Sequence, residues 1–143
     1  RQMCIRDRDY YECLPERIRP DSLTTERIKI IAALTAKGGL LNECDYLWLD
    51  AFKSRIADNL IESLLKYATL LDEHEAFDTK LLISDIIFRF DSVNEAALRL
   101  KCATYVFMRK QYMAKTTYEH FCREYKSLYD EPFEHSFNSI ISQ

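Results

Sequence analysis

Glycine and proline are scarce in this sequence of 143 residues, which contains two glycines and three prolines. This scarcity argues against a β-rich architecture, which needs many tight turns, and favours long helices. Hydrophobic residues make up 48% of the chain and aromatic residues 13%. These proportions exclude a disordered segment and are sufficient for one domain with its own hydrophobic core.

A surplus of positive charge is also missing. Twenty Lys and Arg residues stand against 23 Asp and Glu residues, which gives a net charge of -3. A domain that binds nucleic acid through its phosphates needs excess positive charge on one face. We therefore do not expect this segment to bind DNA directly.

Long apolar runs and paired cysteines are absent as well. No run approaches the roughly 18 residues of a membrane-spanning helix, and no secretory leader opens the chain. The five cysteines, at positions 4, 13, 44, 102 and 122, form no C-x-x-C pair. An odd number of unpaired cysteines predicts reduced thiols in an intracellular, cytoplasmic protein.

The start of the chain differs from the rest. It begins with Arg1 rather than Met, and the opening RQMCIRDR lacks the later periodicity. We expect a fragment in which residues 1–20 are a non-native or flexible tail and residues 21–143 form the folded domain.

Apolar residues recur at helical spacing along the rest of the chain. The first predicted helix has a Ser, Asp or Thr cap and ends at Gly38–Gly39. Asp91 or Ser92 should cap a later helix. Ser92 and Glu95 have the spacing of a capping box, in which the two side chains bind each other's backbone amides. Together the pattern predicts helices over 46–72, 76–90, 92–109 and 111–128, and a short last helix within 133–141.

A repeat connects these helices. LKYAT at 65–69 returns as LKCAT at 100–104, and a shift of 35 residues keeps the apolar positions in register into the next helix. A helix pair repeated with a period near 34 residues is typical of tetratricopeptide-type stacking. We therefore predict an all-α fold, a tetratricopeptide-like stack of antiparallel helix pairs.

The second copy of the repeat fits the tetratricopeptide pattern better than the first. It has small residues at Cys102 and Ala114, followed by the aromatic residues Tyr105 and Tyr118. In the first copy, Thr79 stands where the alanine would lie. The repeat is therefore degenerate.

Four segments, in this order, carry a family resemblance: GGLL (38–41), YLWLDAFKSRI (46–56), DSVNEAALRLK (91–101) and AKTTYEHFCREYKSLYDEPF (114–133). From about residue 26 to 141 the chain resembles the bacterial transcriptional activator domain. This domain is the tetratricopeptide-like module of antibiotic-regulatory-protein-type transcription regulators. Two departures are Ser92, where the family often has proline, and Arg109–Lys110 in place of a Gly-Arg turn.

The resemblance implies a non-catalytic module for oligomerisation and effector function that acts through protein–protein contacts. Its expected partners are its own protomer, an adjacent DNA-binding domain or the transcription machinery. Contact with DNA would require a winged-helix domain that this fragment lacks. The alternative is a free-standing tetratricopeptide-like adaptor, and a helical enzyme is a more remote third.

Three clusters suggest chemistry but have simpler interpretations. DEHE at 72–75 with Asp78 could bind a metal, yet a solvated loop explains it, and neither E-x-x-H nor H-E-x-x-H occurs. His120 and Cys122, two positions apart on a helix, point away from each other. We therefore interpret His120 as a surface residue and Cys122 as a core residue. The aromatic group of Tyr46, Trp48 and Phe52 could bind a ligand, but we interpret it as part of the core. No catalytic residue, metal or cofactor is expected.

One helix face is a candidate partner surface. In stacked helix pairs the first helix of each pair lines a concave groove. On the helix over 92–109 the groove residues would be Arg99, Ala103, Val106 and Phe107. The alternative is that this strip is buried against the helix over 46–72, and the sequence leaves both open.

Overall fold

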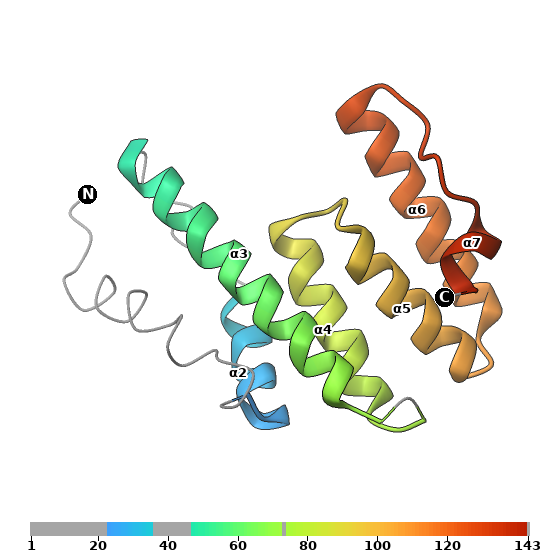
Figure 1. Cartoon of the computed structure of the whole chain (residues 1–143), viewed down its shortest axis with the longest axis horizontal. Helices are drawn as coiled ribbons and strands as arrows, with labels where there is room; N and C mark the ends of the chain where they lie inside the picture. The colour runs from blue at the N-terminus through green and yellow to red at the C-terminus, as the bar shows by residue number, and fades with distance from the viewer. Residues whose placement is uncertain (1–22, 36–46, 73, 143) are drawn as a thin grey trace. The chain divides into compact units, whose positions relative to one another are not determined.

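A computed structural model describes residues 23–35, 47–72 and 74–142, and every regular element in these ranges is a helix. The prediction of an all-α fold is confirmed. None of the described helices is both long and apolar enough to cross a bilayer. The predictions for residues 1–20 and Gly38–Gly39 lie outside the described residues. The helices are α2 (Thr25–Thr35), α3 (Leu47–Leu70), α4 (Phe77–Phe90), α5 (Glu95–Phe107), α6 (Gln111–Tyr129) and α7 (Phe137–Ile141) (Figure 1).

The chain divides into two compact units, residues 1–70 and 71–143. In the first unit, Thr24 accepts a hydrogen bond from the amide of Arg27, so a threonine caps α2 as predicted. The apolar stripe of α3 is buried at Leu60, Leu64 and Ala68. The predicted aromatic cluster at 46, 48 and 52 lies outside the described side chains.

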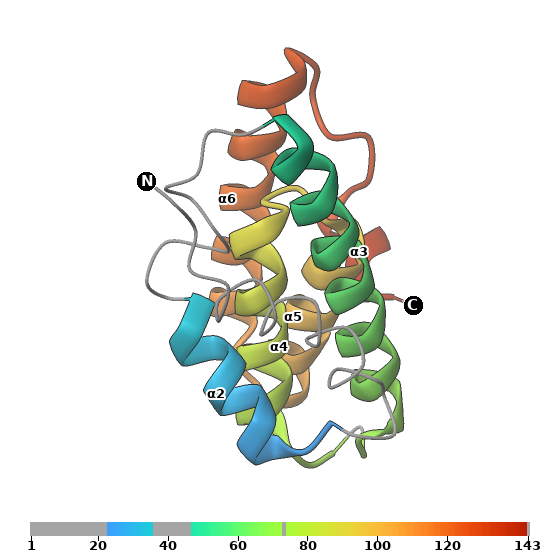
Figure 2. The same cartoon turned by 90° about the vertical axis from the view of Figure 1, so that its left-hand side faces the viewer.

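In the second unit, α4, α5 and α6 lie side by side and alternate in direction (Figures 1 and 2). The connections between these helices are three or four residues long in each case, which forces an antiparallel arrangement. The short α7 returns to pack on α5. This unit therefore contains the predicted stack of antiparallel helices.

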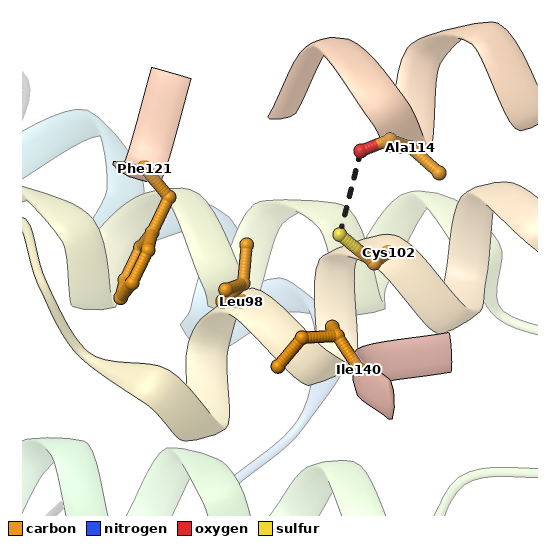
Figure 3. Close-up of a cluster of buried hydrophobic side chains, with 5 residues drawn as sticks. All are labelled: Leu98, Cys102, Ala114, Phe121 and Ile140. Atoms are coloured by element: carbon orange, nitrogen blue, oxygen red, sulfur yellow. Dashed lines mark hydrogen bonds between the residues drawn. The ribbon is translucent and has the colours of Figure 1, made fainter. Parts of the chain in front are cut away.

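Small residues set the spacing of α5 and α6. Cys102 and Ala114 face each other, and the Cys102 Sγ lies 3.5 Å from the carbonyl oxygen of Ala114 (Figure 3). Leu98, Phe121 and Ile140 complete this core cluster, in which every member is buried. The small residues of the second repeat are thus in contact across the two helices.

The start of α5 differs from the predicted capping box. The Asn94 side chain accepts a hydrogen bond from the amide of Ala97 at 2.9 Å and caps the helix. Asp91 accepts from the amide of Val93, which forms a tight turn before the helix. This turn delays the helix by two residues, so the prediction of a box between Ser92 and Glu95 was wrong.

The turn between α5 and α6 begins earlier than predicted, because α5 ends at Phe107 rather than near 109. The amide of Arg109 donates to Val106 O and the amide of Lys110 donates to Tyr105 O. This is a Schellman motif, and it requires a left-handed residue after the helix. Arg109 takes that conformation, with a φ of 61°.

Candidate functional site

The predicted groove residues occupy one face of α5. Arg99, Ala103 and Val106 are half-buried, and Phe107 is 45% exposed at the end of the helix. Their spacing of three and four residues places them on this common face, as the sequence indicated. The alternative of burial against residues 46–72 concerns the other unit and stays a prediction.

Within the second unit, three of these residues already have neighbours. The Arg99 Nη2 lies 2.8 Å from the Glu95 Oε1, and His135 Nε2 is 3.6 Å from the same oxygen. Val106 packs against the core cluster around Leu98. The ring of Phe107 meets the edge of the His74 ring, with 5.4 Å between centroids. The strip is therefore partly occupied by contacts within the chain.

A different surface of the second unit is hollowed. A groove of about 550 Å³ lies among α4, α5 and α6, and none of the four predicted residues lines it. Its lining residues are Asp85, Phe88, Arg89, Ser92, Lys101, Tyr105, Met113, Thr116, Thr117, His120, Phe121 and Glu124.

The groove combines aromatic and charged side chains. Lys101 Nζ lies 2.8 Å from Asp85 Oδ1 and 5.9 Å from the centre of the Phe88 ring. The ring centres of Phe88 and Phe121 lie 6.4 Å apart. The exposed His120 is one of the residues that α6 contributes to the lining. Such a surface can hold an apolar side chain of a partner while polar groups contact its flanks. The sequence pattern missed it because its residues come from three helices.

The pKa values of two side chains in or beside the core are raised. Burial raises the pKa of the Cys102 thiol to about 12. Burial, and then the neighbouring Cys122 thiol, raises the pKa of Tyr118 to about 12. The Tyr118 hydroxyl donates a hydrogen bond to the carbonyl oxygen of His135 at 2.6 Å. Both groups are neutral near pH 7, and each has a structural contact.

The remaining sequence candidates are separated in the structure. His120 is exposed, as the surface interpretation expected, whereas Cys122 is half-buried rather than part of the core cluster. His74 is exposed, and its amide binds the Asp72 carboxylate in the loop before α4. Among the described residues, no group of three or more His, Cys, Asp or Glu side chains is placed to hold a metal ion.

Large apolar side chains are exposed near both ends of α6. Near its start, Tyr112 is 81% and Met113 43% exposed, and the exposed cations Arg109, Lys110 and Lys115 flank them in the sequence. We call these five residues the basic end. No single periodicity in the sequence marks them, because they lie in a turn and in the first turns of the helix that follows.

Near its finish, α6 exposes a second apolar surface of the opposite charge. Leu128 is 59% exposed and Tyr129 is 55% exposed. The exposed anions Asp130, Glu131 and Glu134 follow directly in the chain. We call these five residues the acidic end.

Comparisons with known proteins add no relative to this picture. No protein-family model matches the chain, and neither curated proteins nor solved structures gave a match.

Proposed function

We propose that this chain is a non-catalytic oligomerisation and effector module of a bacterial transcription regulator, working in the cytoplasm through protein–protein contacts. The observation that carries the proposal is the exposure of Tyr112, Leu128 and Tyr129 beside clustered charges. Apolar patches with a polar rim are typical of protein contact surfaces.

The family resemblance supports the transcriptional part of the proposal. The segment 91–101 forms the turn before α5 and its first half, and the segment 114–133 forms most of α6 and the turn after it. The resembling residues therefore build the helix pair that meets at Cys102 and Ala114, and they include all of the acidic end except Glu134.

A transcription assay tests this function. The chain would be fused to a monomeric DNA-binding domain whose operator lies upstream of a weak bacterial promoter. We expect a several-fold rise in reporter transcription that falls when Tyr112 and Leu128 are changed to Ser. Exposed Glu119 lies in the middle of α6, and its change to Lys serves as the matched control. A folded fusion that occupies the operator without raising transcription would contradict the proposal.

The groove among α4, α5 and α6 favours the second candidate, a tetratricopeptide-like adaptor that binds a partner segment. The coding sequence upstream of Arg1 separates the two candidates. A winged-helix domain there supports the regulator, whereas further helix pairs of about 34 residues support the adaptor.

A further inference from the structure

We propose that copies of this chain associate head to tail, with the basic end of one copy docked on the acidic end of the next. The inference rests on the proposed function for its protein-contact role and goes further by naming the partner as a second copy. It is carried by two exposed apolar surfaces of opposite charge on the same helix.

The two ends are complementary in both apolar and charged groups. The basic end offers Tyr112 and Met113 between three cations, and the acidic end offers Leu128 and Tyr129 before three anions. Contact between them would bury apolar area in the centre and place opposite charges at the rim, which is the usual arrangement of an interface.

The loop before α4 limits the basic end on one side. His74 contacts Phe107, and the same loop carries Asp72 and Glu75, so Phe107 is not counted in the basic end. In the part of the second unit that the structure describes, Arg109, Lys110 and Lys115 form no ion pair with any of these carboxylates. The cations remain available to a partner.

The charges of α6 run against its own dipole. A helix favours anions near its start and cations near its finish. Helix α4 follows this rule, with Asp78 in its first turn and Arg89 in its last. Helix α6 has no acidic residue in its first turn, and Lys110 directly precedes it. Although Lys126 lies in the last turn, three anions follow that turn.

Only a second molecule can bring the two ends together. Helix α6 has 19 residues. At 1.5 Å per residue this corresponds to a length of roughly 28 Å. In a second copy aligned along α6, the acidic end and the negative helix terminus would meet the basic end and the positive terminus. Such a contact uses two different surfaces, so it leads to open chains or closed rings rather than a symmetric pair.

Analytical ultracentrifugation of the whole chain tests the proposal. We expect the average mass to rise with protein concentration and to fall as NaCl increases from 50 to about 500 mM, since salt screens exposed charges. Two variants would each remove one end: Lys110→Glu with Lys115→Glu, and Glu131→Lys with Glu134→Lys. Both place charges as the dipole of α6 prefers, so the helix should keep its circular dichroism signal.

The mixture of the two variants is the decisive measurement. Each variant alone should remain monomeric because it lacks one of the required surfaces. The first retains the acidic end and the second retains the basic end, and the reversed charges at their other two ends also complement each other. An equimolar mixture should therefore regain the rise of average mass with concentration that each variant alone lacks. The control, Glu119→Lys with Arg123→Glu, exchanges charges in the exposed middle of α6 and should associate as the unmodified chain does.

Three results would overturn the proposal: an unmodified chain that is monomeric at all concentrations, a variant that still associates like the unmodified chain, or a mixture of the two variants that does not associate. These results are independent of the reporter assay. Head-to-tail association without transcription activation would leave this inference intact and refute the proposed regulator. Activation by a strictly monomeric chain would do the reverse.

Discussion

At the scale of single residues, the smallest side chains set the distance between α5 and α6. Cys102 and Ala114 are fully buried and in contact across the two helices. A thiol in this position can contribute packing and a weak hydrogen bond as long as it is protonated. Ionisation of this thiol should therefore lower the stability of the fold rather than create a reactive group.

The Cys102 thiol should make stability depend on alkaline pH. Its pKa is about 12 in the folded protein and 9.0 in the absence of its surroundings. Because the folded pKa is raised, the stabilisation is complete below about pH 9 and is lost between about pH 9 and 12. Between pH 8 and pH 10 we expect the free energy of unfolding, measured with urea, to fall by about 1 kcal/mol through this group.

The variant Cys102→Ala isolates that contribution from the other groups that titrate at alkaline pH. Its stability should decrease less between pH 8 and pH 10 than that of the unmodified chain. Equal decreases in the two proteins would show that the thiol ionises as easily in the folded state as in the unfolded one.

The cap of α5 gives a second prediction at this scale. Removing the Asn94 side chain leaves the amide of Ala97 without its acceptor. We expect Asn94→Ala to lower the free energy of unfolding by about 1 kcal/mol, a typical value for a lost helix cap. The exposed Ser92 serves as the comparison, and Ser92→Ala should shift the urea midpoint far less. A larger effect at Ser92 would restore the capping box that the sequence suggested.

At the scale of helices, the repeat of 35 residues places several matching side chains in similar surroundings, with exceptions of which one pair of lysines is the most informative. Thr79 and Ala114 are both buried, as are Ile86 and Phe121. Lys80 and Lys115 also match in the sequence, but Lys115 is exposed. Lys80 is only 6% exposed, and its Nζ donates a hydrogen bond to the carbonyl oxygen of Asp72 at 2.6 Å.

The two lysines should therefore respond differently to the same substitution. Lys80→Met keeps most of the side-chain volume but removes the donor to Asp72, and should cost about 1–3 kcal/mol in thermal or urea unfolding. Lys115→Met changes an exposed position and should stay within about 0.5 kcal/mol of the unmodified chain. Similar decreases in the free energy of unfolding for the two variants would mean that Lys80 and Lys115 have equivalent structural roles.

Periodicity was sufficient to predict the helices and their antiparallel stacking, because both depend on spacing along the chain. It placed the start of α5 incorrectly, since Asp91, Ser92 and Asn94 are all good caps and only the local turn selects among them. It also could not find the groove at Lys101 and His120, whose residues come together only when three helices pack. The four residues predicted on α5 do share a face, and their partner role stays a prediction.

At the scale of the whole molecule, the second unit contains a complete core cluster. Leu98, Cys102, Ala114, Phe121 and Ile140 all belong to residues 71–143, as do the side chains that pack around them. Many domains of about this size fold alone when they have a core of their own. The second unit is therefore a natural fragment to isolate.

We expect residues 71–143, expressed alone, to show a helical circular dichroism spectrum and a cooperative urea transition. Ile140→Ala should destabilise the fragment and the whole chain by similar amounts, about 2–5 kcal/mol, because it empties the same buried site in both. A fragment without a cooperative transition would show that this cluster is insufficient for folding.

The scarcity of glycine has a consequence for protein engineering. Ala76, Arg109 and Asp130 have positive φ values of 57°, 61° and 54°, and each lies beside the end of a helix. Glycine adopts this conformation without the steric cost of a Cβ atom. The three positions are therefore the first to change when a more heat-resistant form is wanted. Arg109 belongs to the basic end and Asp130 to the acidic end. Glycine at either position would increase stability but would remove a charge that a partner could bind.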